Sequence, residues 1–312
     1  MTRALITTDP IDDAARDIDP AMDVGLPPAG WRLPRATQLG HVSLQIADLA
    51  RSTAYYQNVL GLRVLHQTAT SALLGTADGG TPLVQLTERK GASHVPLHGR
   101  LGLYHYAILL PDRSALGTFI AHLADINERA GASDHLVSEA LYLRDPDGLG
   151  IEVYSDRPRS TWVAIDRQLQ MATEPLDIAD LLRAAGGERW SGMPAGTTMG
   201  HVHLHVGDLD QAAAFYHTAL GLDKMVWSYP SALFLAAGGY HHHLGLNTWA
   251  GASAPRPVET DARLVEWRVV LPSTDDAART ATNLARAGYD VVASDDSWLA
   301  TDPWGTPVRL LA

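Results

Sequence analysis

The segment LGHVSLQIADLARSTAYYQNVLGLRVL, residues 39–65, recurs as MGHVHLHVGDLDQAAAFYHTALGLDKM at residues 199–225. Each copy begins with alternating residues typical of a strand and passes an Asp-Leu pair typical of a helix start. A helical run with two adjacent aromatic residues follows, and Leu-Gly-Leu then leads into a second strand. This internal repeat decides the architecture, because each copy is expected to form one structural unit.

A second pair of similar segments starts at LYHYAILLP, from residue 103, and at VEWRVVLP, from residue 265. Each is followed by a helical run and a closing strand, and their ends correspond as DPDGLGIEVY (145–154) and DPWGTPVRLL (302–311). The sequence therefore predicts four βαβββ modules, at about 38–90, 100–157, 198–250 and 263–312.

One such module would leave an apolar sheet face uncovered, so modules must pair, and a curved sheet of two modules encloses a cup. We therefore predict an α+β protein with two cup-shaped, curved mixed β-sheets and helices outside them. The predicted organisation is an extended N-terminal arm at 1–37, a first domain (modules one and two) at 38–157, a linker with one short helix at 158–197, and a second domain (modules three and four) at 198–312.

Composition narrows the range of partners. The 46% apolar content can fill the cores of two domains, and a net charge of −11 provides no basic stripe for nucleic acid or an anionic membrane. No Cys occurs, which leaves His, Asp and Glu as metal ligands. The N-terminus lacks the apolar core of a signal peptide, and no uncharged stretch reaches the roughly 20 residues of a membrane helix. We expect a cytoplasmic protein that forms a homo-oligomer.

Three sequence features resemble the vicinal oxygen chelate superfamily, which has the glyoxalase/bleomycin resistance/dioxygenase fold. They are the Gly-His-Val strand, the helix ending in Tyr-Tyr or Phe-Tyr before Leu-Gly-Leu, and the Asp-Pro-x-Gly-x-x-x-Glu ending. Within it, SEALYLRDPDGLGIEVYSDRPRSTW (138–162) and SALFLAAGGYHHHLGLNTW (231–249) resemble the extradiol ring-cleaving dioxygenases of the bacterial catechol-2,3-dioxygenase group. The resemblance covers nearly everything after the arm. It implies Fe(II)-dependent cleavage of catechol or a substituted catechol by O2, giving a product of the 2-hydroxymuconic semialdehyde type.

The resemblance also limits the metal ligands to the first and last strands of paired modules. The candidates in modules one to four are His41 and Gln85, then His105 and Glu152, then His201 and the run His241–His243, then Glu266 and Arg309. If modules paired in sequence order, one cup would hold His41, His105 and Glu152. The other would hold Arg309 where a carboxylate belongs, and its guanidinium would repel a cation.

If modules two and three paired instead, one cup would collect His105, Glu152 and His201 beside the His-rich segment. The remaining cup would then be degenerate, with Arg309 paired to Glu266. Both arrangements occur in the superfamily, and we favour this one because it brings a spare His to a complete ligand set. Two His and one carboxylate suit Fe(II), and Mn(II) is the alternative because this set does not select strongly between them.

Each candidate ligand also has a purely structural interpretation. A lone His in an apolar strand, such as His105, is commonly a core residue, but burying Glu152 nearby without a cation or donor would cost several kcal/mol. His201, His203 and His205 alternate along one strand and cannot all bind one ion. The family's Gly-His position indicates His201, and the other two either line the pocket or are structural.

The remaining roles follow from the resemblance alone. It places an acid–base His on the last strand of module three, where His242 matches best, and the other strand register would turn His241 and His243 inward. It also places a substrate-binding Tyr ten residues before the ligand Glu, which is Tyr142, although a simple strand aromatic would fit as well. His135 is a candidate for a supporting donor.

Other functions use the same cup. A glyoxalase-like isomerase or lyase would need no O2 but usually has a fourth protein ligand, commonly a second carboxylate, and none is evident. A metal-free protein that sequesters antibiotics would have no reason to keep the three ligands together. A substituted quinol or a bicyclic diol stays open as the substrate.

Overall fold

The computed structural model describes residues 24–96, 99–251 and 253–312. The first part of the predicted arm, residues 1–23, lies outside these ranges. The rest of the arm packs against module three, where Leu26 bridges to Lys224 and Arg32 forms an ion pair with Asp223 at 2.6 Å. No helix among the described residues has the length and apolar character needed to cross a membrane.

All four predicted modules have the element order βαβββ. Module one contains β2 (Val42–Ile46), α1 (Leu49–Asn58), β3 (Arg63–Gln67), β4 (Ser71–Gly75) and β5 (Pro82–Glu88). Module two contains β6 (Gly102–Leu109), α2 (Arg113–Asp125), β7 (Gly131–Asp134), β8 (Ser138–Arg144) and β9 (Gly150–Asp156).

Modules three and four repeat this order. Module three contains β12 (Thr198–His205), α4 (Leu209–Ala212) continued by a π-helical segment (Ala213–Ala219), β13 (Asp223–Val226), β14 (Ala232–Ala236) and β15 (Leu244–Asn247). Module four contains β16 (Arg263–Val270), α5 (Thr274–Arg286), β17 (Val291–Ser294), β18 (Ser297–Thr301) and β19 (Pro307–Leu311). The short elements outside the modules are β1 (Gln38–Leu39), a 3₁₀ turn (Arg159–Thr161), β10 (Ala164–Ile165), β11 (Gln168–Leu169) and α3 (Ile178–Ala184).

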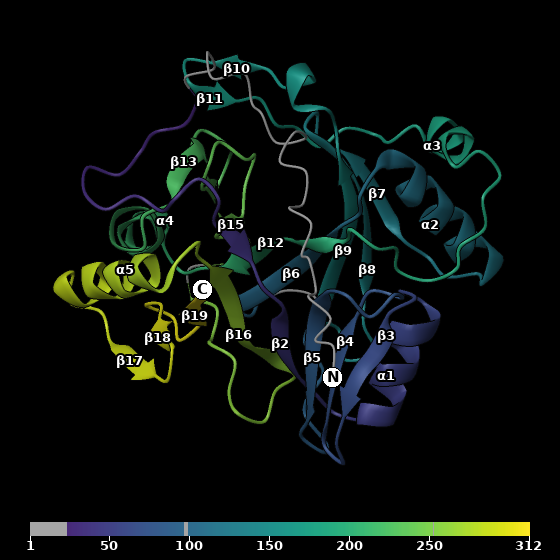
Figure 1. Ribbon diagram of the computed structural model, residues 1–312, viewed down its shortest axis with the longest axis horizontal. Helices are drawn as coiled ribbons and strands as arrows, with labels where there is room; N and C mark the ends of the chain where they lie inside the picture. The colour runs from purple at the N-terminus through teal and green to yellow at the C-terminus, as the bar shows by residue number, and fades with distance from the viewer. Residues whose placement is uncertain (1–23, 97–98, 252) are drawn as a thin grey trace, which may run out of the picture.

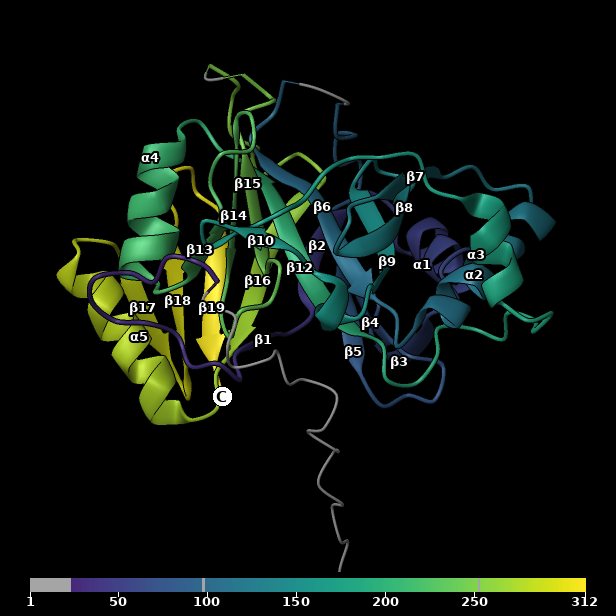
Figure 2. The same ribbon diagram turned by 90° about the horizontal axis from the view of Figure 1, so that it is seen from above.

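The Asp-Leu pairs start helices as predicted. The side chain of Asp48 accepts a hydrogen bond from the backbone N–H of Arg51 at 2.9 Å, and Asp208 accepts one from Gln211 at 2.8 Å. These side chains satisfy N–H groups that the first helical turn leaves without partners. In both views the strands run through the middle of the molecule, with α1, α2 and α3 on one side and α4 and α5 on the other (Figures 1 and 2).

The modules pair two with three and one with four. One sheet has the order β13-β14-β15-β12-β6-β9-β8-β7, and the other has the order β17-β18-β19-β16-β2-β5-β4-β3, with β1 also on β16. Antiparallel pairing of β12 with β6 joins the first sheet, and β16 with β2 joins the second. The favoured pairing is confirmed and the sequential pairing is wrong. Each sheet takes strands from both predicted domains, so the boundaries 38–157 and 198–312 stay predictions.

The sheet of modules one and four has the predicted ion pair in place of a ligand set. The guanidinium of Arg309 lies 2.8 Å from a carboxylate oxygen of Glu266, and that of Arg268 lies 2.8 Å from the other. Two cations therefore already neutralise this carboxylate. His41, the ligand of the rejected pairing, directly precedes β2 in this sheet.

Candidate metal centre

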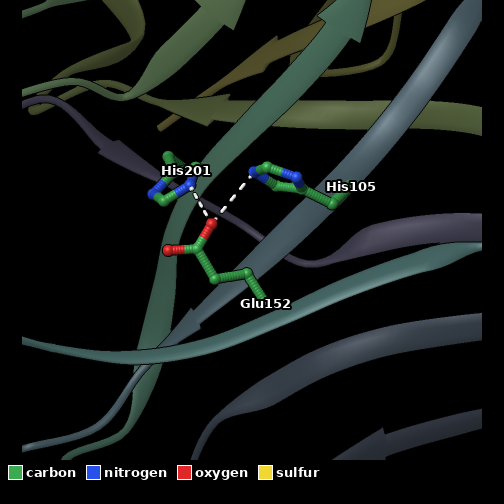
Figure 3. Close-up of side chains that lie close together, drawn as sticks. All are labelled: His105, Glu152 and His201. Carbon is green, nitrogen blue, oxygen red and sulfur yellow. Dashed lines mark hydrogen bonds and ion pairs between the residues drawn. The ribbon is translucent and has the colours of Figure 1, made fainter. Parts of the chain in front are cut away.

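Three side chains converge on one point in the sheet of modules two and three. Glu152 Oε2 lies 3.0 Å from His105 Nε2 and 3.1 Å from His201 Nε2 (Figure 3). All three residues are buried, and among the described residues they form the one group of three or more His, Asp or Glu side chains close enough to share a metal ion.

Strand register explains why these side chains meet. Glu152 on β9 and His201 on β12 are both Cα partners of Ala107 on the intervening strand β6. Tyr142 on β8 is the Cα partner of Glu152 and extends the same row. Neighbouring strands lie about 4.8 Å apart, and residues in one row point to one face. His105 precedes Ala107 by two residues and therefore shares that face.

The small residues around this row leave room for the site. Ala107 is fully buried and lies in the row between Glu152 and His201, whose side chains meet directly at 3.1 Å. Directly before His201, an added Cβ at Gly200 would clash with the hydroxyl of Tyr154. The Gly-His pair of the repeat is therefore needed here because the ring of Tyr154 packs on that of His201, with ring centroids 4.9 Å apart.

The donor set fits a divalent cation. His201 Nδ1 is buried without a hydrogen-bond partner among the described residues, and the one polar contact printed for His105 Nε2 is the carboxylate of Glu152, 3.0 Å away. A buried polar nitrogen without a partner normally costs free energy. Burial lowers the pKa of both imidazoles and so favours their neutral, ligating form. Burial alone would raise the pKa of the Glu152 carboxyl, but the adjoining His201 and His105 hold it well below its usual value. Neutral imidazole and ionised carboxylate are the forms that bind a metal.

The site opens into a cavity of about 240 Å³. Beside the three converging residues, aromatic side chains supply much of its wall, and no Lys or Arg is among its described lining residues. The aromatic lining residues are Tyr104, Tyr142, Tyr229, Phe234 and Trp249. Such a cavity suits a small, uncharged, flat molecule.

Tyr142 and His135 line this cavity and are hydrogen-bonded to each other. His135 Nδ1 lies 2.7 Å from the carbonyl of Ala172, and because a carbonyl only accepts, that nitrogen carries the proton. In the neutral imidazole this tautomer makes Nε2 the acceptor for the Tyr142 hydroxyl, which lies 2.6 Å away. Burial, together with the charge of Glu152, raises the pKa of Tyr142 well above its usual value, so its hydroxyl stays protonated.

The His-rich segment differs from the expectation in one respect. His241–His243 were predicted to lie on the last strand of module three, but β15 begins only at Leu244. Gly238 and Gly239, with φ of 65° and 71°, form a turn before the three histidines, so the alternation of a strand does not apply to them. Of the three, only His242 lines the cavity, with its ring centroid 4.1 Å from that of His201.

His203 and His205 form hydrogen bonds with Asn247, a residue that the sequence analysis did not identify. His203 Nε2 lies 2.9 Å from Asn247 Nδ2, and His205 Nδ1 lies 2.6 Å from Asn247 Oδ1. His203 lines the cavity but does not join the metal cluster. Asn247 is fully buried at the end of β15, and only its pairing with β12 reveals its role.

Comparison with known proteins agrees with this geometry. The family model of the Glyoxalase/Bleomycin resistance protein/Dioxygenase superfamily matches residues 38–153 and 198–306. A Catechol-2,3-dioxygenase of Bacillus subtilis (strain 168) is 47% identical over 271 residues, which cover 86% of this chain and 94% of the relative. A Lactoylglutathione lyase of Haemophilus influenzae is 30% identical over 128 residues, which cover 38% of this chain and 93% of the relative.

Solved structures show the same fold at low sequence identity. A crystal structure from Bacillus subtilis subsp. subtilis str. 168 has a TM-score of 0.61 and 16% identity, covering 90% of this chain and 86% of that one. Glyoxalase I from Zea mays has a TM-score of 0.52 and 17% identity, covering 88% and 92%. The predicted resemblance is thus confirmed by family model, relative and fold, and the chain belongs to the Glyoxalase/Bleomycin resistance protein/Dioxygenase superfamily.

Proposed function

We propose that this protein is an extradiol dioxygenase that opens the ring of catechol or a substituted catechol with O2. The observation that carries the proposal is the convergence of His105, Glu152 and His201 on a cavity with aromatic walls. The 47% identical relative named Catechol-2,3-dioxygenase, which the alignment covers almost completely, supports the same activity. The expected product is of the 2-hydroxymuconic semialdehyde type.

His105, Glu152 and His201 are the proposed ligands of Fe(II), with Mn(II) as the alternative. A metal held by these three residues would supply positive charge and free coordination positions, and so would lower the entropy cost of bringing the diol and O2 together. The protein contributes a buried, preformed ligand set and a cavity with aromatic walls.

His242 is the proposed acid–base residue. Burial lowers its pKa well below the usual value, so the imidazole is neutral and can accept the phenolic proton of the bound diol. The same nitrogen can return that proton to the oxygen that departs when the O–O bond breaks. A single His can perform both steps because imidazole both accepts and donates a proton.

Tyr142 and His135 are proposed to orient the substrate. Because the hydroxyl of Tyr142 donates to His135, its lone pairs are available to accept a hydrogen bond from a substrate hydroxyl. His135 is itself held by the carbonyl of Ala172. The pair therefore fixes the direction in which the Tyr142 hydroxyl points.

Two alternatives are less well supported. A glyoxalase-like isomerase or lyase usually has a fourth ligand, but Glu152 is the one acidic residue among the described lining residues of the cavity. The lyase relative matches only 38% of this chain. An antibiotic-sequestering protein would not need three buried, converging ligands. A cytoplasmic location and a homo-oligomeric assembly stay predictions.

Anaerobic reconstitution with Fe(II), followed by catechol and then air, tests the proposal through the appearance of a yellow ring-opened product near neutral pH. Glu152→Ala and His201→Ala should lose both iron and product formation, whereas His41→Ala, in the other sheet, should keep both. Activity with Ni(II) or Zn(II) and none with Fe(II) would overturn the dioxygenase proposal in favour of an isomerase.

A further inference from the structure

His241 is buried with both ring nitrogens in hydrogen bonds, although it does not line the catalytic cavity. Its Nδ1 lies 2.7 Å from Nδ1 of His242, and its Nε2 lies 2.9 Å from Oδ1 of Asp156. The residue is fully buried, so neither ring nitrogen contacts solvent. A chain of hydrogen bonds therefore runs from Asp156 through His241 to the proposed acid–base residue.

The partners of each nitrogen determine where the protons lie. A carboxylate accepts hydrogen bonds, so Nε2 of His241 carries a proton and donates it to Asp156. A neutral imidazole protonated on Nε2 has a lone pair on Nδ1, and in that form of His241 the proton between the two rings belongs to Nδ1 of His242. His242 is left with a lone pair on Nε2, for which the described residues supply no hydrogen-bond partner.

The surroundings of Asp156 support this direction. The hydroxyl of Tyr240 donates to the same oxygen, Asp156 Oδ1, at 3.1 Å, and the hydroxyls of Tyr154 and Tyr240 lie 2.6 Å apart. Two donors on one oxygen leave that oxygen as an acceptor only. Asp156 follows Glu152 by four residues on β9, so both side chains project to the same side of the strand.

The far end of the chain lies outside the catalytic cavity. Asp156 and Tyr240 line a second cavity of about 600 Å³ that runs between the two sheets, and the two cavities share no described lining residue. The side chain of Asp156 keeps 26% of its exposure. The carboxylate is thus placed where it can hold His241 without contact to the substrate or to the three candidate ligands.

We propose that Asp156 and His241 are positioning residues that hold His242 in the tautomer with a proton on Nδ1 and a lone pair on Nε2, directed at the substrate hydroxyl. This inference rests on the proposed function, because it assigns a role to the base of that reaction. In this arrangement a carboxylate orients one imidazole, His241, and that imidazole orients a second, His242. Loss of the carboxylate would leave the His242 ring in place but free to adopt the other tautomer.

The variant Asp156→Asn tests the inference, because its amide nitrogen can donate to His241 Nε2 and reverse the whole chain. We expect kcat to fall by roughly 100-fold or more while the KM for catechol changes by less than about threefold. In protein labelled with nitrogen-15 at histidine and loaded with diamagnetic Zn(II), long-range proton–nitrogen NMR should show the wild-type His242 protonated on Nδ1. Asp156→Asn should move that proton to Nε2, and the loss of signals in His242→Gln assigns the ring.

Two further variants keep the test decisive. His241→Phe preserves ring volume but removes the acceptor, so it should lower kcat like Asp156→Asn even if the latter folds poorly. Tyr240→Phe removes a donor to Asp156 but leaves the chain to His242 intact, so kcat should stay within about threefold. A wild-type His242 protonated on Nε2, or full activity in both Asp156→Asn and His241→Phe, would overturn the inference. Absence of product from the wild type would instead overturn the proposed function, since the NMR result does not depend on activity.

Discussion

A larger side chain at Ala107 should weaken metal binding, and a matched variant elsewhere can distinguish this effect from a general loss of fold stability. Ala107 lies between Glu152 and His201 in one row of the sheet and is fully buried. Ala107→Leu adds three carbon atoms to this space, and overpacking of this kind costs about 1–3 kcal/mol. Metal ligands tolerate displacements of only about 0.2 Å, so pushing the two side chains apart should weaken iron binding roughly 10–100-fold.

The assay is iron content per chain after Fe(II) loading and desalting, together with the melting temperature of the metal-free protein. Ala300→Leu is the matched control, because Ala300 is also a fully buried strand alanine but lies on β18 in the other sheet. Both variants should melt several degrees lower, and only Ala107→Leu should lose iron. Iron binding by Ala107→Leu equal to that of the wild type would refute the proposal that this row frames the metal site.

Three further predictions concern substrate positioning, acid stability and specificity. Tyr142→Phe removes the hydroxyl that donates to His135, so kcat should fall about tenfold with iron content unchanged, as measured by steady-state kinetics and metal analysis. Burial raises the pKa of Asp145 from 3.8 to about 7, so the folded protein holds a proton there that the unfolded chain releases above about pH 4. The protonated carboxyl of Asp145 stabilises the fold fully below about pH 4, and this stabilisation is lost as the pH rises to 7. In denaturant unfolding, the wild type should therefore lose stability relative to Asp145→Asn between pH 5 and 7. The difference in unfolding free energy between the two proteins should be constant above pH 7. Because the described cavity lining has no Lys or Arg, a catechol with a carboxylate substituent should be cleaved with at least about tenfold lower kcat/KM than catechol. Equal kcat/KM values would contradict the hypothesis that the cavity binds an uncharged substrate.

The elements of this fold could be predicted from local sequence because their signals are local. Alternating apolar residues, the Asp48 and Asp208 helix starts and the Leu-Gly-Leu turns each involve only neighbouring residues, and the modules they predict are the ones observed. The π-helical segment of module three was not predicted, since its periodicity differs from that of an α-helix by too little to see in seven residues.

Only part of the candidate site could be predicted from local sequence. His105 and Glu152 belong to one module and could be associated by a buried carboxylate that needs a partner. The choice of His201 over His41 depended on which modules share a sheet, and the orientation of His242 depended on the Gly238–Gly239 turn that keeps the three histidines out of the strand. No feature near Asp156 or Asn247 in the sequence distinguishes them from ordinary polar residues at strand ends.

The sequence by itself therefore determined the four modules, their element order and the residue types available to bind a metal. The tertiary structure decided that β12 pairs with β6, and this pairing brings His201 beside Glu152 and leaves Arg309 with Glu266 in the other sheet. The physical reason is that strand formation depends on a few consecutive residues, whereas sheet pairing depends on the packing of whole apolar faces. Two similar modules present similar faces, so only the complete set of contacts selects one partner over the other.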